Sequence, residues 1–208
     1  MKRIEELTNY IAPFKIIADI GCDHGYLIKL AFDKGLIEKA YAIDNKIGPL
    51  DNAKKNLSDY QNVTFLLSDG LDDLPLDTEV IVLSGMGGAL VTKILEKNVH
   101  KLESVNRIII EANRNSELVR KFGEEHSLTI VSEKIIEEED IFYEIIVLEK
   151  GKMQLNPLEI KFGPVLLKDK DDMFIKKWTK QLAIYIDKKT NKLDKEIKEI
   201  KDVLNYED

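Results

Sequence analysis

The sequence predicts a doubly wound α/β fold, in which a mostly parallel sheet ends in an antiparallel hairpin and is followed by a small helical domain. In residues 1–150, short apolar runs alternate with stretches of helical pattern, which is typical of parallel strands with helices on both faces of the sheet. Two strand-like runs then follow each other directly, so they can pair antiparallel. After Asp171, apolar residues recur every three or four positions, as on one face of a packed helix. We therefore expect one domain over residues 1–152 and a second over residues 153–208.

The elements of the first domain are expected in a regular order. Each predicted strand is a short apolar run that ends in polar or glycine residues: Ile16–Ile20, Lys39–Asp44, Val63–Leu67, Val80–Ser84 and Arg107–Ala112. Helices are expected at Gly25–Lys34, Ile47–Leu57, Ala89–Lys97 and Ser116–His126. The final strands, Leu128–Ile136 and Phe142–Glu149, are joined by the acidic run Glu137–Asp140.

The C-terminal region predicts two packed helices. One apolar set, spaced by three or four residues, is Ile175, Trp178, Leu182 and Tyr185, and a second is Leu193, Ile197, Ile200 and Leu204. The sets are out of register, and the polar stretch Asp187–Lys192 separates them. We expect an antiparallel coiled-coil hairpin, and one long broken helix is the alternative.

The composition is that of a folded protein in water. The chain has 208 residues, of which 44% are hydrophobic and 33% charged, so it has enough apolar surface to offset chain entropy. No run approaches the ~20 apolar residues of a membrane-spanning helix, and the N-terminus lacks the apolar segment of a secretory signal. The single cysteine, Cys22, excludes an intramolecular disulfide framework. We expect a cytoplasmic, monomeric protein without membrane contact.

The charge is unevenly distributed along the chain. The net charge of −7 argues against a polyanionic partner, but residues 151–208 contain 13 lysines and 11 acidic residues. A local basic patch can bind phosphate whatever the total charge. The C-terminal lysines therefore indicate either a nucleic-acid face or a solvated helical surface.

The segment Asp19–Tyr26 (DIGCDHGY), which follows the first predicted strand, is the strongest local signal. In this fold, a glycine turn and the next helix N-terminus form the site for a nucleotide-like ligand. Gly21 and Gly25 give G-x-x-x-G instead of the dinucleotide pattern G-x-G-x-x-G, and Asp23 puts a carboxylate where a pyrophosphate would lie. The segment favours a ligand without phosphates, such as a nucleoside with a positive centre; an ordinary strand-to-helix turn is the alternative.

Three more loops are expected at the same edge of the sheet. Asp44 follows Gly21 by 23 residues, the approximate spacing at which an acid accepts hydrogen bonds from a ribose diol. The carboxylate of Asp69, in Ser68-Asp69-Gly70, suits the amine of an adenine ring, and Gly85-Met86-Gly87-Gly88 offers bare backbone to a ligand. A helix-capping aspartate, an Asp-Gly turn and a flexible turn are the respective alternatives.

Metal or nucleophile chemistry is not indicated. His24, His100 and His126 are scattered, and no group of residues has metal-ligand spacing. Cys22 has no cysteine or histidine partner at a known spacing, so we expect it to be a small packing residue.

On these residues the chain resembles the bacterial tRNA (adenine(22)-N1)-methyltransferase family. The similarity rests on Asp19–Tyr26, Asp44, Ser68–Leu71 and Gly85–Gly88, and it continues in the second domain at Phe162-Gly163-Pro164, Lys168-Asp169-Lys170 and Phe174–Thr179. The resemblance implies a Rossmann-like domain that binds S-adenosyl-L-methionine, a C-terminal coiled-coil domain and a tRNA partner. The implied cofactor pocket consists of Asp19, Gly21, Asp23, His24, Asp44, Asn45, Ser68, Asp69, Gly70, Gly85, Met86 and Gly87.

The same resemblance implies the catalytic residues. Asp23 would be the catalytic carboxylate, and Tyr26 would lie near the target adenine. A carboxylate at Asp23 is suited to accept a hydrogen bond from the N6 amine of that base, and helix packing is the alternative role for Tyr26. The chain departs from the family pattern at Cys22, Gly25 and Asp44, where Ser, Ala and Glu are expected. Glu111-Ala112-Asn113 stands where the family tends to have Gln-Pro-Asn, so only Asn113 of that loop keeps an expected substrate role.

The expected function is therefore methyl transfer from S-adenosylmethionine to N1 of an adenine in tRNA. Lysines of the second domain would contact tRNA phosphates: Lys168, Lys170, Lys176, Lys177, Lys180, Lys188, Lys189 and Lys192. Phe174 and Trp178 are expected to pack within the helical domain. A non-catalytic RNA or protein adaptor on the same scaffold and an NAD-dependent oxidoreductase are the alternative functions.

Overall fold

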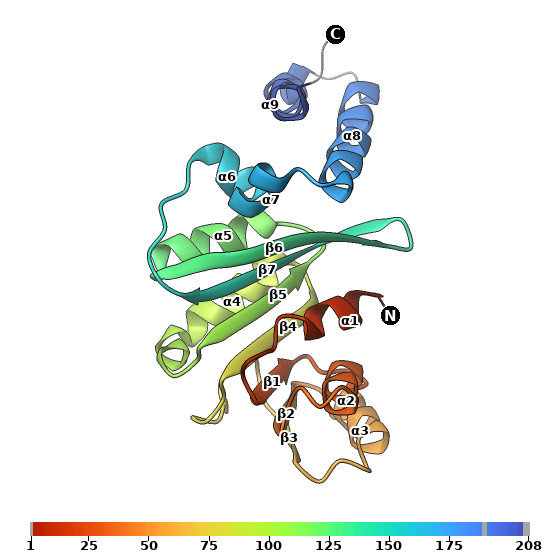
Figure 1. Cartoon of the computed structure of the whole chain (residues 1–208), viewed down its shortest axis with the longest axis vertical. Coiled ribbons are helices and arrows are strands. Elements are labelled where there is room, and N and C mark those ends of the chain that lie inside the picture. Colours follow the sequence, from red (N-terminus) through yellow and green to blue (C-terminus); the bar gives the residue numbers. More distant parts are fainter. Residues whose placement is uncertain (1, 189–190, 206–208) are drawn as a thin grey trace.

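One seven-stranded sheet forms the centre of the protein, and its strand order is β3-β2-β1-β4-β5-β7-β6 (Figure 1). The structure, a computed structural model, describes residues 2–188 and 191–205. The strands are β1 (Ile16–Ile20), β2 (Lys39–Asp44), β3 (Val63–Leu67), β4 (Val80–Met86), β5 (Arg107–Ala112), β6 (Leu128–Glu138) and β7 (Ile141–Lys150). The first five are parallel, and β7 is antiparallel to both β5 and β6. The predicted doubly wound sheet with a terminal hairpin is confirmed.

Helices cover both faces of this sheet. They are α1 (Lys2–Thr8), α2 (Tyr26–Asp33), α3 (Ile47–Asn56), α4 (Gly88–Lys97) and α5 (Ser116–Glu125), with a short 3₁₀ helix, η1 (Val99–Glu103). Side chains of α1, α2 and α3 share one apolar core with the sheet, and those of α4 and α5 share the other. Four of the five α-helices were predicted; α1 was not.

The hairpin between β6 and β7 has a tighter turn than the sequence suggested. Both strands run further than predicted, and only Glu139 and Asp140 lie between them. Their φ angles are +52° and +63°, as in the two-residue turns that match the twist of a hairpin. Long β6 and β7 thus form one edge of the sheet.

Two short helices follow β7. These are α6 (Pro157–Phe162) and α7 (Pro164–Asp169), each with proline in its first turn, where the missing N–H costs nothing. Asn156 begins α6 with a capping box: its side chain accepts hydrogen bonds from Leu158 and Glu159. Proline and glycine therefore mark helix boundaries here.

Two longer helices complete the C-terminal region. They are α8 (Asp172–Asp187) and α9 (Asp194–Leu204), preceded by a 3₁₀ turn, η2 (Asn191–Leu193). Phe162, Phe174 and Trp178 are buried in a third apolar core, which also includes Ile135 of β6. The packing role expected for Phe174 and Trp178 is confirmed.

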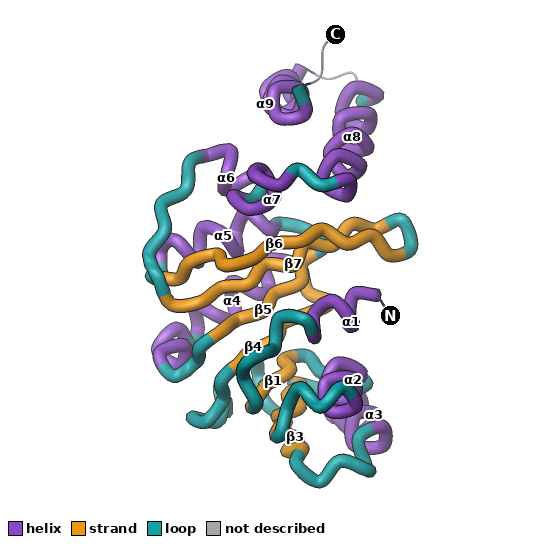
Figure 2. The backbone as a smooth tube through the Cα atoms, viewed as in Figure 1, coloured by secondary structure: helices purple, strands orange, loops and turns teal. Residues whose placement is uncertain are grey.

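The relative direction of α8 and α9 differs from a simple hairpin. Figures 1 and 2 show α8 from its side and α9 nearly along its axis, so the two helices cross instead of lying alongside each other. Two separate helices are present, but the coiled-coil detail is not confirmed. Part of the polar stretch Asp187–Lys192, including Lys189, lies outside the described residues.

A buried ionic cluster joins the C-terminal helices to the sheet. Arg120 of α5 donates a hydrogen bond of 2.7 Å to Glu133 of β6 and another to Glu144 of β7. Glu144 also accepts from Lys177 of α8, and Glu133 from the backbone N–H of Val165 at 2.9 Å. Burial alone would raise the pKa of Glu144, but the charges of Lys177 and Arg120 outweigh it and lower that pKa to about 2.

Within the described part of the chain, no helix combines the length and apolar character that crossing a membrane requires.

Candidate functional site

A cavity of about 410 Å³ opens at the carboxyl ends of the parallel strands, a volume within the usual range of small-molecule sites. β1 lies between β2 and β4, so the chain winds away from β1 in both directions, and this switch point is where doubly wound sheets bind ligands. The lining residues are Ile20, Gly21, Asp23, Ile43, Asp44, Asn45, Lys46, Pro49, Ser68, Asp69, Gly70, Met86, Leu90 and Ile94.

The turn after β1 brings backbone close to the cavity. The N–H groups of Gly21 and Cys22 both donate to the carbonyl oxygen of Ile43, at 2.8 and 3.1 Å. Gly21 has φ +75°, and a Cβ there would lie 2.5 Å from Cε of Met86. The left-handed backbone conformation favours glycine at this position, and a side chain there would also displace the end of Met86.

The loop that follows separates two cavities. Asp23, with φ +45°, is exposed and lines the first cavity. Tyr26, 50% exposed, lines a second cavity of about 440 Å³ between α1, α2 and the end of α3. Between them, the His24 ring stacks on Tyr26 at 5.3 Å between centroids, and His24 Nε2 lies 3.7 Å from an Asp23 oxygen. An aromatic pair and a carboxylate therefore stand together on the loop between the two cavities.

Asp19 lies beneath this loop and does not line the cavity. Its side chain is buried, and burial together with the carboxylates of Asp44 and Asp23 raises the pKa of Asp19 to about 7. Burial, reinforced by Asp19, also raises the pKa of Cys22, so the thiol stays protonated and unreactive. Cys22 belongs to the apolar core on the α1–α3 side, which confirms its expected packing role.

Asp44 and the turn after β3 form the opposite wall. Asp44 is the last residue of β2; its Oδ1 accepts from the backbone N–H of Lys46 at 2.9 Å, and its carbonyl from that of Ser68 at 2.9 Å. Asp69 pairs with Lys97 of α4 at 3.0 Å. These bonds hold two carboxylates on neighbouring loops at one edge of the cavity.

Gly70 adjoins the apolar side of the cavity. Its φ is +63°, and a Cβ there would lie 2.7 Å from Cγ2 of Ile94. Ile94 and Leu90 are spaced by four residues on α4, so they present one apolar face. A flat apolar ring has room against this side.

The glycine-rich segment after β4 contributes one side chain and close packing. Met86 lines the cavity, whereas Gly85 and Gly87 do not. A Cβ on Gly88 would lie 2.1 Å from the carbonyl oxygen of Asn115, so this glycine lets α4 begin against the loop before α5. The expected wall of bare backbone is therefore not formed by Gly85 and Gly87, and this segment contributes the Met86 side chain to the cavity.

Of the twelve predicted cofactor residues, eight line the cavity: Gly21, Asp23, Asp44, Asn45, Ser68, Asp69, Gly70 and Met86. Asp19 and Gly85 adjoin them near the ends of β1 and β4, and His24 and Gly87 lie in the segments that follow these strands. The sequence analysis missed Ile20, Ile43, Lys46, Pro49, Leu90 and Ile94. A signal existed for Ile20 and Ile43, since each is an apolar residue at the carboxyl end of its strand.

At least four of the eight C-terminal lysines expected to contact phosphate have partners within the chain. Lys176 and Lys177 pair with Glu137 and Glu144, while Lys170 and Lys180 donate to backbone carbonyls. Lys189 lies outside the described residues. Lys176, Lys177 and Lys180 therefore tie α8 to the β6–β7 hairpin, Lys170 ties the end of α7 to α9, and those four offer less free charge than the sequence suggested.

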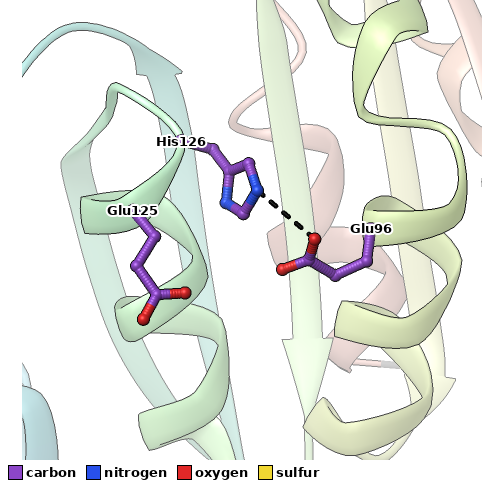
Figure 3. A group of neighbouring side chains, drawn as sticks. All are labelled: Glu96, Glu125 and His126. Carbon is purple, nitrogen blue, oxygen red and sulfur yellow. Dashed lines mark ion pairs between the residues drawn. The ribbon is translucent and has the colours of Figure 1, made fainter.

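Figure 3 shows the one group of side chains, within residues 2–188 and 191–205, that comes close to metal-ligand geometry: Glu96, Glu125 and His126. His126 Nε2 lies 3.3 Å from Glu96, and its Nδ1 lies 2.9 Å from the carbonyl oxygen of Phe122. The group is largely exposed and does not line the cavity. An ion pair that ties the end of α5 to α4 accounts for it.

Comparison with known proteins adds independent evidence. A family model described as tRNA (adenine(22)-N(1))-methyltransferase matches residues 17–207. The tRNA (adenine(22)-N(1))-methyltransferase of Bacillus subtilis is 31% identical over 191 residues, covering 87% of this chain and 80% of that protein. A putative tRNA methyltransferase of Mycoplasma pneumoniae is 30% identical over 85% of each chain.

Solved structures agree. The Streptococcus pneumoniae putative tRNA (m1A22) methyltransferase in complex with S-adenosyl-L-methionine superimposes with a TM-score of 0.93 at 33% identity, covering 98% of this chain and 99% of that one. The Mycoplasma capricolum enzyme in complex with S-adenosyl-homocysteine gives a TM-score of 0.83 at 26% identity, covering 99% and 94%.

Proposed function

Because the chain belongs to the tRNA (adenine(22)-N(1))-methyltransferase family, we propose that it transfers a methyl group from S-adenosylmethionine to N1 of adenine 22 in tRNA. One observation supports this most directly. The cavity at the switch point brings together Gly21, Asp44, Asp69 and Met86, which are distant in sequence and suit the successive parts of one nucleoside ligand.

The donor set fits S-adenosylmethionine better than a dinucleotide. The carboxylate of Asp44 offers acceptors to both ribose hydroxyls, and that of Asp69 can accept from the exocyclic amine of adenine. Asp23 lines the cavity beside the turn after β1, and a carboxylate there suits a sulfonium and repels a pyrophosphate. When bound, the cofactor supplies a methyl group that its positive sulfur already activates.

The remaining cofactor contacts come from the same loops. Gly21 lets the ligand approach the backbone, Asn45 and Ser68 offer polar groups beside the two carboxylates, and Met86 closes the far side. We assign Asp19, His24, Gly70, Gly85 and Gly87 to the support of these loops. Ile94 and Leu90 provide the apolar surface for the adenine ring.

Asp23 and Tyr26 serve the acceptor base. N1 of adenine lies on the Watson–Crick edge, so the base must be unpaired before it reacts, at a cost of a few kcal/mol. Asp23, exposed at the mouth of the cavity, accepts a hydrogen bond from N6 and offsets the positive charge that develops on the ring. Tyr26, held by its stack on His24, offers a face to the extruded base. The chemistry then depends mainly on alignment of N1 with the methyl group, where positioning can contribute ~7–11 kcal/mol.

We further infer that the protein acts as a monomer in the cytoplasm, with residues 1–152 as the methyltransferase domain and residues 153–208 as a tRNA-contacting domain. The basic excess of the second region supports this division. Exposed Lys168 and Lys188 are the preferred candidates for phosphate contacts there. Size-exclusion chromatography with light scattering tests the monomer.

The central experiment incubates the protein with bulk tRNA and methyl-labelled S-adenosylmethionine, then maps the modified nucleoside. We expect 1-methyladenosine at position 22. Methylation at another atom or position, or no methylation by protein that binds S-adenosylhomocysteine, would contradict the proposal. Thermal shift with S-adenosylhomocysteine against NAD separates it from an oxidoreductase, since only the former should stabilise the protein.

A further inference from the structure

Three side chains from separate elements meet at the carboxyl edge of the sheet, beside the cofactor cavity. Ser84 of β4 donates a hydrogen bond of 2.6 Å to Glu111 of β5, and Arg3 of α1 donates one of 2.9 Å to the same carboxylate oxygen. Arg3 also donates to Glu138 at 2.8 Å and stacks on Tyr143 at 4.2 Å from its ring centroid. Strands β4 and β5, helix α1 and the terminal hairpin are thus connected through Glu111.

A carboxylate in this position is costly. Glu111 is completely buried, and its second oxygen, Oε1, has no hydrogen-bond partner among the described residues. An unpaired buried polar atom costs ~1–3 kcal/mol, and an apolar residue of similar size often serves stability as well as a buried ion pair does. Stability alone therefore does not explain Glu111.

The backbone beside Glu111 is irregular. Leu83 of β4 pairs with Ile110 of β5, but the next pair is Met86 with Ala112. Two residues of β4, Ser84 and Gly85, therefore stand opposite the single residue Glu111. This is a β-bulge, which is rare between parallel strands and serves to redirect a side chain next to active sites. Gly85, with φ +72°, makes the bulge possible.

The bulge decides where Met86 points. Met86 is the first residue after the bulge and lines the cofactor cavity. Its Cε lies 2.5 Å from the place that a Cβ on Gly21 would occupy. The Ser84–Glu111 hydrogen bond joins the bulged residue to the residue that it faces, so it holds the bulge in one conformation. Arg3, whose Nη1 lies 2.9 Å from Oε2 of Glu111, orients the carboxylate from the other side.

We propose that Glu111 is a positioning residue for methyl transfer: it clamps the β4 bulge through Ser84 and so fixes Met86 against the cofactor. The proposal rests on the function proposed above, since it requires that the cavity bind S-adenosylmethionine. It adds that a residue outside the cavity, held by the first helix of the chain, sets the affinity of that cavity.

The test compares Ser84→Ala with the matched control Thr92→Ala. Thr92 is half-buried on the side of α4 that faces α5, it does not line the cofactor cavity, and its hydroxyl donates to the carbonyl of Ala89 within the same helix. We expect Ser84→Ala to weaken S-adenosylhomocysteine binding and raise KM for S-adenosylmethionine by about tenfold, in line with a lost hydrogen bond to a charged group. KM for tRNA should stay within twofold, and Thr92→Ala should behave as wild type.

A second pair of variants separates the hydrogen bond from simple packing. Glu111→Gln keeps an acceptor for Ser84, so cofactor affinity should remain within about threefold of wild type, whereas Glu111→Met should reproduce the loss seen in Ser84→Ala. Equal losses in both variants would overturn the proposal. So would a Ser84→Ala protein whose only change is a lower thermal midpoint. If wild type itself fails to bind S-adenosylhomocysteine, the proposed function fails instead.

Discussion

Arg120 and Glu133 form a salt bridge of 2.7 Å in which neither side chain is exposed. The guanidinium also donates to Glu144 and to the backbone carbonyl of Ile160 at 3.2 Å. One cation thus satisfies two buried carboxylates and one end of α6. The C-terminal helices are held to the sheet by charge as well as by their apolar core.

Replacement of Arg120 by alanine should be strongly destabilising. Arg120→Ala leaves Glu133 and Glu144 buried with less compensation, so we expect the free energy of unfolding to fall by ~3–5 kcal/mol in urea titrations. Lys121→Ala, an exposed neighbour, is the control and should change it by less than ~0.5 kcal/mol. A loss below ~1 kcal/mol for Arg120→Ala would show that solvent replaces the guanidinium.

Asp19 should make stability depend on pH. Its pKa is about 7 in the folded protein against 3.8 for an ordinary aspartate, so between about pH 4 and 7 the folded state holds a proton that the unfolded chain has lost. The free energy of unfolding attributable to Asp19 therefore falls as pH rises through this window. Asp19→Asn should gain on the order of 2–4 kcal/mol relative to wild type between pH 4 and 8. A difference that does not change with pH would contradict the raised pKa.

Asp23 should affect catalysis more than cofactor binding. Asp23→Ala removes the acceptor for N6, so we expect the methylation rate to fall ~10²-fold or more, while S-adenosylhomocysteine binds within about threefold of wild type. Asp51→Ala serves as the control, because it removes a different exposed carboxylate, which lies on α3. If calorimetry shows that Asp23→Ala no longer binds the cofactor product, Asp23 is a cofactor ligand and not an acceptor for the base.

Gly21 and Gly35 provide a matched test of close approach. Both have positive φ, +75° and +65°, so alanine strains both backbones by ~1–2 kcal/mol. Only at Gly21 does the new Cβ meet another atom, Cε of Met86, whereas at Gly35 no atom lies within 4 Å. Gly21→Ala should therefore weaken S-adenosylhomocysteine binding at least tenfold, and Gly35→Ala should lower only the thermal midpoint. Equal binding by both variants would remove Met86 from the site.

The sheet could be predicted because each parallel strand is buried and reads as an apolar run. Helix α1 could not, since it is short and only Ile4 and Leu7 mark an apolar face within it. Its stability comes from contacts with distant residues: Leu7 packs in the core, and Arg3 pairs with Glu111. Helices α6 and α7 were not predicted, because each has only six residues and is too short to show a helical apolar period.

The residues of the candidate site that follow the parallel strands could be predicted from the sequence. Fold topology alone places Gly21, Asp44 and Asp69 at one edge, because parallel strands share their carboxyl ends. The apolar wall from Leu90 and Ile94 depends on how α4 packs, and no local pattern separates such residues from ordinary core. The partners of the C-terminal lysines could not be predicted either, since Lys177 and Glu144 are 33 residues apart in the sequence.

The long outer strand β6 is contacted by α7 and α8, which lie on its outer side (Figure 1). A bare strand edge of 11 residues would be a template for pairing with another chain. A shortened protein that ends at residue 152 would present that edge to its neighbours, together with the apolar surface of Ile135. Such a fragment should precipitate on expression, in which case the last quarter of the chain prevents self-association of the sheet.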